Sequence, residues 1–150
     1  MNITVGAVTR KDASLAVALL MPQIMRGVQL DFFVKRGVTQ TQFLLLSAIR
    51  ANGRCAMGLL ARNLHISLPT ASGIVDRLVR SGYVRRSALP GDRRCVVVAL
   101  TAKSERFFRD FQSVVRRRWE EVLIGLEPDE LQAFHDVMTK LRLHLQETQR

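Results

Sequence analysis

The chain has 150 residues, of which 47% are hydrophobic, and this length and composition suit one globular domain with a buried core. Its apolar stretches are shorter than the roughly 20 residues that a transmembrane helix needs, and its two cysteines, Cys55 and Cys95, suit neither a disulfide framework nor a paired zinc site. These features argue against membrane insertion and secretion, and they predict a cytoplasmic location.

The net charge of +10 is unevenly distributed along the chain. Nine arginines and only two acidic residues lie between residues 50 and 101, whereas the two ends of the chain are nearly neutral. Because guanidinium groups form paired hydrogen bonds with phosphates and guanine edges, this segment suits a nucleic-acid contact. A solvated basic surface is the alternative explanation.

Two helices are expected in the first third of the chain. Apolar residues recur every three or four positions through residues 11–35, which predicts a first helix with a candidate kink at Pro22. A second helix is expected to open at Thr39, because Thr39 and Gln42 match a capping box. This helix is predicted to end near Ala51, before the Asn-Gly break.

Two more helices follow, around residues 57–63 and from Ser67 to about residue 81. Ser67 is a favourable N-cap for the second of them. Its apolar residues Ala71, Ile74, Val75 and Leu78 fall on one side, so the opposite side is expected to be polar. The residues predicted to face outward are Thr70, Ser72, Gly73, Asp76, Arg77 and Arg80.

The pattern then changes from helical to extended. Residues 83–88 and 95–100 are strand-like, and the Leu-Pro-Gly-Asp sequence between them predicts a hairpin with a tight turn and a basic tip. A long helix is expected from Thr101 and a last helix after Pro128. The apolar stripe of the last helix requires a partner helix, which a second subunit can supply. That stripe consists of Leu131, Phe134, Met138, Leu141 and Leu145.

This order of elements is that of a winged helix-turn-helix module. An α-helix fits the major groove of DNA, and its N-terminal residues approach the bases most closely. In this chain those residues are Pro69, Thr70 and Ser72. Arg77 lies farther along the helix, where it can reach a guanine or a phosphate, or pair internally with an acid.

The motifs resemble those of the MarR family of bacterial regulators over roughly residues 10–147. Residues 60–67 are similar to the first helix and turn of the family's DNA-binding motif, and residues 70–84 to its recognition helix and exit. The most specific likeness is Asp92-Arg93-Arg94, followed after a strand by Leu100-Thr101. Gly73 departs from the arginine of many relatives, and the glycine that usually follows the Leu-Thr pair is missing.

The resemblance implies a mainly α fold with a small β-hairpin wing. A single domain is expected, with a winged helix-turn-helix region at about residues 37–100 and dimerisation helices at about 10–36 and 101–147. It also implies that Arg94 and Arg93 reach the minor groove or its phosphates, with Asp92 holding them in place. The residues predicted to contact DNA are Ser67, Pro69, Thr70, Ser72, Gly73, Arg77, Asp92, Arg93 and Arg94.

The function predicted from these features is sequence-specific regulation of transcription. A homodimer is expected to bind a pseudo-palindromic operator in double-stranded DNA as a repressor, and a small-molecule effector to release it. A nucleoid-type architectural protein that binds DNA by charge and shape is the alternative. No motif supports catalysis, a metal site or a cofactor. Cys55 and Cys95 are interpreted as buried or incidental rather than as oxidant sensors.

Overall fold

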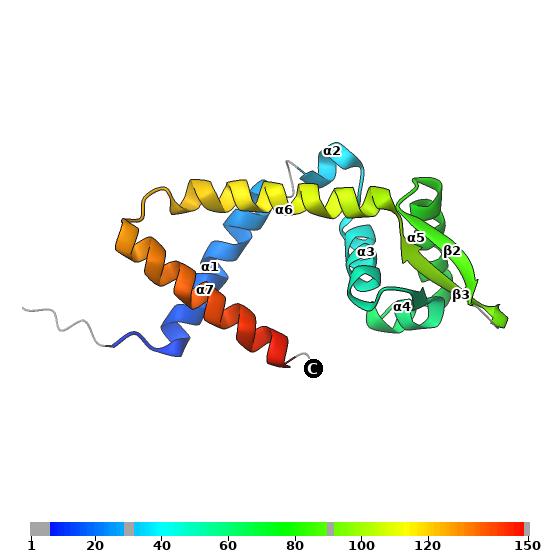
Figure 1. Ribbon diagram of the computed structural model, residues 1–150, viewed down its shortest axis with the longest axis horizontal. Coiled ribbons are helices and arrows are strands. Elements are labelled where there is room, and N and C mark those ends of the chain that lie inside the picture. Colours follow the sequence, from blue (N-terminus) through cyan, green and yellow to red (C-terminus); the bar gives the residue numbers. More distant parts are fainter. Residues whose placement is uncertain (1–6, 29–31, 90–91, 149–150) are drawn as a thin grey trace, which may run out of the picture. The chain divides into compact units, whose positions relative to one another are not determined.

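A computed structural model describes residues 7–28, 32–89 and 92–148 of the chain, the side chains of residues 89 and 92–95 excepted (Figure 1). The elements, in chain order, are α1 (Arg10–Val28), α2 (Val34–Arg36), α3 (Gln40–Asn52), β1 (Cys55–Ala56), α4 (Met57–Asn63), α5 (Leu68–Arg80), β2 (Val84–Leu89), β3 (Asp92–Leu100), α6 (Ala102–Leu123) and α7 (Pro128–Thr148). They form a mainly helical protein with one small antiparallel sheet, which confirms the predicted fold class. The chain divides after Val115 into two compact units.

Local signals in the sequence explain where α3 and α5 begin. The Thr39 side chain accepts a hydrogen bond from the backbone N–H of Gln42, and the Gln42 side chain accepts one from the backbone N–H of Thr39. This is the predicted capping box, and it satisfies two N–H groups that the helix itself leaves unpaired. Ser67 caps α5 in the same manner by accepting a hydrogen bond from the N–H of Thr70.

The N-terminal helix agrees with the sequence pattern in the residues that the structure describes. α1 contains Pro22 within the helix and ends at Val28, and a short helical segment at residues 32–36 leads to Gly37. Gly37 has a left-handed φ of 61°, which favours glycine at a helix end. Residues 29–31, which the predicted helix also included, lie outside the described part.

The sheet contains the predicted hairpin and one additional strand. β3 lies between β1 and β2, and Val98 pairs with Cys55 on one side and with Arg86 on the other. β3 begins at Asp92, three residues before the predicted start, because its pairing with β2 extends toward the hairpin tip. The two residues of β1 are too few to show periodicity, so this strand was not predicted. Pro90 and Gly91, the centre of the predicted turn, lie outside the described part.

The core of the first unit lies between α3, α5, the sheet and the first turns of α6. The predicted apolar face of α5 is buried as expected. Phe107 on α6 is buried, and the centre of its ring lies 4.9 Å from that of Phe32 and 5.4 Å from that of Tyr83. The aromatic rings therefore join α6 to the residues before α3 and to the start of β2.

The second unit contains the end of α6 and all of α7. The rings of Trp119 on α6 and Phe134 on α7 lie 5.9 Å apart. α7 begins at Pro128, as predicted, but much of its apolar stripe faces solvent in the single chain, with Leu141 50% and Leu145 59% exposed. Among the described residues, every helix is too short or too polar to span a bilayer.

Replacement of Thr39 by alanine tests the capping box. We expect Thr39→Ala to lower the free energy of unfolding by about 1 kcal/mol, because the backbone N–H of Gln42 loses its protein acceptor. Thr41→Ala is the matched control, since it makes the same change at an exposed position in the first turn of α3. Urea unfolding followed by circular dichroism measures both variants, and equal destabilisation by the two would contradict the cap.

Candidate nucleic-acid interface

α5 combines a buried apolar face with an exposed polar N-terminal end. Ala71, Ile74, Val75 and Leu78 are buried, so the helix is held in one rotation about its axis. Ser67, Pro69 and Thr70 are exposed at its start, as predicted, whereas Ser72 and Gly73 are half-buried. A helix fixed on one side and polar at its exposed end has the form required for insertion into a groove.

The first turn of α5 carries a pair of hydroxyl groups. The Oγ of Ser67 and the Oγ1 of Thr70 lie 2.7 Å apart, and the Oγ of Ser67 also accepts the 3.2 Å hydrogen bond from the Thr70 N–H. One of the two hydroxyl protons forms the hydrogen bond between these oxygens, so the proton of the other hydroxyl remains available to donate to an acceptor outside the protein. The same serine therefore begins the helix and belongs to its polar surface.

Arg86 on β2 links the wing to the outer side of α5. Its Nη1 lies 2.6 Å from the Oδ1 of Asp76, and its Nη2 donates to the Oγ of Ser72 at 3.3 Å. Asp76 was predicted to face outward, and its side chain is partly exposed, but the sequence did not show that it pairs with this arginine. The sequence identified Arg86 only as one of nine arginines, since nothing in the local pattern shows that β2 passes beside α5.

The contact with Arg86 determines how the Ser72 hydroxyl can act. Because its oxygen accepts a hydrogen bond from the guanidinium group, the hydroxyl keeps its own proton for donation. Ser72 is therefore suited to an acceptor such as a guanine O6 or N7, a thymine O4 or a phosphate oxygen.

The structure shows whether Arg77 pairs with an acid in the same unit and whether packing requires glycine at position 73. Arg77 is exposed and forms no ion pair within the described part of the chain, so its guanidinium group is accessible to solvent. A Cβ built on Gly73 meets no atom within 4 Å. Packing therefore does not require glycine at this position, since a Cβ there meets open space.

For the arginines of the wing, the structure describes the backbone but not the side chains. Asp92, Arg93 and Arg94 form the first residues of β3, and Asp92 pairs with Leu89 across the hairpin. Their side chains lie outside the described part, so their predicted contacts stay predictions.

The first turn of α6 holds the corner between α5 and β2. The Nζ of Lys103 donates to the carbonyl oxygen of Ser81 at 2.7 Å, and the Oγ1 of Thr101 donates to that of Gly82 at 2.7 Å. The buried Ser104 hydroxyl donates to the carbonyl oxygen of Tyr83. Three successive carbonyl groups therefore have partners on α6 or on Thr101, the residue just before it, even though the glycine usual at the start of this helix is missing.

Cys55 belongs to the core of the same unit. It is fully buried in β1, and burial raises the pKa of its thiol, which disfavours the reactive thiolate. This supports the interpretation of Cys55 as a core residue. The side chain of Cys95 lies outside the described part.

A short helix, a tight connection, a helix with an exposed polar end and a β-hairpin together define a winged helix-turn-helix protein. Residues 38–96 match the model of the MarR family. YfiV of Bacillus subtilis (strain 168), described as an uncharacterized HTH-type transcriptional regulator, is 30% identical over 109 residues, which are 73% of this chain and 68% of YfiV. The chain belongs to the MarR family and is a transcriptional regulator.

Solved structures show the same fold. The transcriptional regulator Tm0710 from Thermotoga maritima matches with a TM-score of 0.82 and 21% identity, over 93% of this chain and 97% of that chain. A point mutant of MepR from S. aureus, bound to an oligodeoxyribonucleotide, matches with a TM-score of 0.70 and 18% identity, over 89% of this chain and 97% of that chain.

The link between wing and helix can be tested by a double-mutant cycle with Asp76→Ala and Arg86→Ala. We expect a coupling free energy of about 0.2–1 kcal/mol, because both side chains are partly exposed to water. Arg85→Ala is the control, since Arg85 is the exposed neighbour of Arg86 on β2, and its effect should add to that of Asp76→Ala. Unfolding in urea gives the free energies, and a zero coupling for Arg86 would contradict the ion pair.

Proposed function

We propose that this regulator binds a pseudo-palindromic operator in double-stranded DNA as a homodimer and represses transcription until a small-molecule effector releases it. The observation that carries the proposal is the exposed, polar N-terminal end of α5 on a helix whose opposite face is buried. MepR, which shares the fold, has been solved bound to an oligodeoxyribonucleotide, and this supports DNA as the partner. Residues 37–100 are the proposed DNA-binding region.

Helix α5 and the wing have different tasks in this proposal. In the major groove, each base pair presents a distinct pattern of hydrogen-bond donors and acceptors. In this proposal, the end of α5 that enters the groove carries Pro69, Thr70 and Ser72. Ser72 donates its free proton to a base or phosphate acceptor. The hairpin supplies Arg93 and Arg94 to the minor groove or its phosphates, where a narrow groove concentrates negative potential. Ser67, Gly73, Arg77 and Asp92 complete the proposed contact surface.

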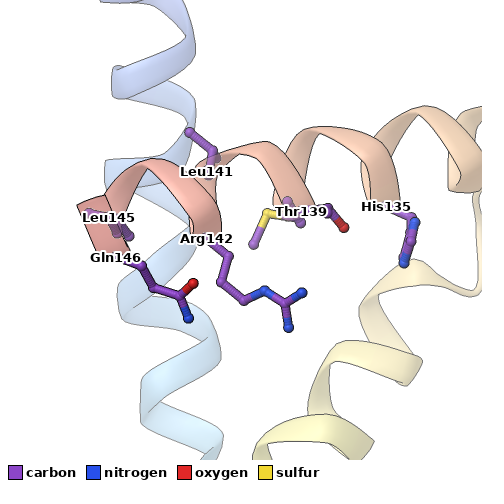
Figure 2. Close-up of a pocket in the computed structure, with 7 residues that line it drawn as sticks. His135, Thr139, Leu141, Arg142, Leu145 and Gln146 are labelled. Atoms are coloured by element: carbon purple, nitrogen blue, oxygen red, sulfur yellow. The ribbon is translucent and has the colours of Figure 1, made fainter. Parts of the chain in front are cut away.

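The apolar surface of α7 supports a dimer. Met138, Leu141 and Leu145 line a hollow of about 670 Å³ together with polar residues of the same helix (Figure 2). Its other lining residues are His135, Thr139, Arg142 and Gln146. A contiguous apolar face of this kind is usually covered in solution. We propose that a second copy of the chain covers it, with residues 10–36 and 101–147 as the dimerisation segments.

A hollow in the first unit supports the effector proposal. Phe43 on α3 and Phe108 and Phe111 on α6 line a space of about 340 Å³. The guanidinium carbon of Arg50 lies 4.6 Å from the centre of the Phe108 ring and is also part of the lining. Aromatic walls with one cation suit a small apolar ligand that carries a polar or anionic group. Binding of such a ligand to one conformation preferentially would lower the affinity for the operator.

The wing and the helix are distinguished by two substitutions measured on operator and scrambled DNA. We expect Arg94→Ala to weaken binding to both DNAs together and to reduce the salt dependence by about one unit for each phosphate that the variant no longer neutralises. We expect Ser72→Ala to cost about 1–3 kcal/mol on the operator and much less on scrambled DNA, because a base contact carries sequence information. Fluorescence titration at several salt concentrations measures both, on an operator recovered from genomic fragments that the protein retains.

Ser81→Ala is the control for this experiment, because it removes the same hydroxyl at the C-terminal end of α5 and should leave both affinities unchanged. If folded Arg94→Ala binds both DNAs like the wild type, the wing assignment is wrong. If Ser72→Ala weakens both DNAs equally, the helix only positions the protein, and the architectural alternative is favoured.

The dimer is tested by a carboxylate placed in the stripe of α7. We expect Leu141→Asp to convert a dimer into a folded monomer at micromolar concentration, because association would bury a charge without a partner. Ala133→Asp adds the same group at an exposed position of α7 outside the stripe and should leave the dimer intact. Light scattering with circular dichroism reads out both, and a wild-type monomer with a native spectrum would overturn the dimer and the two-half-site operator together.

A further inference from the structure

Four cationic side chains surround a hollow of about 440 Å³ in the first unit. The hollow lies between the end of α2, the corner where α5 leads into β2, and the first turns of α6. Its lining residues are Arg36, Tyr83, Lys103, Arg106, Phe107, Arg109 and Asp110. It shares no lining residue with the aromatic hollow between α3 and α6 or with the exposed end of α5.

Two of the four cations are held in place by contacts that use only part of their hydrogen-bonding capacity. The Nη2 of Arg36 lies 2.9 Å from the Oδ2 of Asp110, and the guanidinium carbon of Arg36 lies 4.1 Å from the centre of the Phe32 ring. Lys103 donates to the Ser81 carbonyl oxygen and lies 4.6 Å from the centre of the Tyr83 ring. Guanidinium has five N–H groups and ammonium has three, so both retain donors for a ligand.

The other two cations form no ion pair with an acidic residue in the described part of the chain. These are Arg106 and Arg109, which are both exposed. Asp110 is the one acidic residue of the described lining, and it is already paired with Arg36. Burial raises the pKa of the Tyr83 phenol, so this side chain adds no negative charge near neutral pH. The hollow therefore has an excess of positive charge.

The aromatic residues of the lining offer little apolar surface to a ligand. Tyr83 is 7% exposed and Phe107 is 3% exposed, because both rings pack into the core. A ligand at this position gains from charge and hydrogen bonds rather than from burial of an apolar body. Arginine forks match both carboxylates and phosphates in geometry, but a phosphate group has more acceptor oxygens and more negative charge with which to engage several cations.

We propose that this hollow is a binding site for a compact anion that carries a phosphate group, with Arg36, Lys103 and Arg106 as its principal ligands. Lys103 joins the site to the carbonyl group of Ser81, the residue that caps the C-terminal end of α5. Its occupant thus contacts the residues that fix the corner between helix and wing. The inference goes beyond the proposed function and does not depend on operator binding.

Calorimetric titration of the full-length protein with pyrophosphate tests the site in the absence of DNA. We expect saturable binding to the wild type and an affinity at least about fivefold lower for Arg106→Gln, because a unit charge close to the anion is removed. Arg117→Gln is the matched control, since it removes an exposed arginine from the same helix outside the hollow and should bind like the wild type. Circular dichroism checks that each variant is folded.

The outcomes separate a specific site from other sources of phosphate binding. Equal weakening by Arg106→Gln and Arg117→Gln would show a response to net charge and would overturn the proposal, as would the absence of saturable binding to the wild type. If pyrophosphate does not bind but Arg106→Gln lowers DNA affinity more than Arg117→Gln does, the surface contacts DNA phosphates instead. Failure of the wild type to bind any operator would contradict the proposed function and leave the pyrophosphate result standing.

Discussion

The arrangement of helix and wing depends on the anchoring of three successive carbonyl groups by the first turn of α6. Ser81, Gly82 and Tyr83 connect α5 to β2, and their carbonyl oxygens accept hydrogen bonds from Lys103, Thr101 and Ser104, respectively. A chain that leaves a helix exposes carbonyl groups without helical partners, which is costly where water is excluded. Side chains of α6 meet this need, and so the direction in which β2 leaves α5 is coupled to the position of α6.

The charges of the first unit are arranged around this corner. On one side Arg86 connects β2 to Asp76 and Ser72 of α5, and on another Lys103 and Arg36 border the cationic hollow. Each of these pairs is partly exposed, so it contributes little to the free energy of unfolding. Their contribution is geometric, because the fixed donors of a guanidinium group orient the side chains that they contact. Stability comes instead from the buried residues between α3, α5 and the sheet.

The apolar surfaces of the protein have two different environments. In the first unit, the aromatic side chains at the start of α6 pack against Phe32 and Tyr83 and are almost completely buried. In the second unit, the stripe of α7 has the periodicity of a packed helix but remains largely exposed in a single chain. Apolar periodicity therefore identifies a face that needs a partner, without distinguishing a partner in the same chain from one in another.

The sequence by itself determined the features that arise within a few residues. It predicted the capping box at Thr39, the N-cap at Ser67, the buried face of α5 and the start of α7 at Pro128, because these follow from hydrogen bonds and periodicities along one segment. The tertiary structure alone decided the pairing of β1 with β3, the burial of Phe107, the ion pair of Asp76 with Arg86 and the hollow beside Arg36. Each of these joins residues from separate elements, and their distance in space depends on how the whole unit packs rather than on any local pattern.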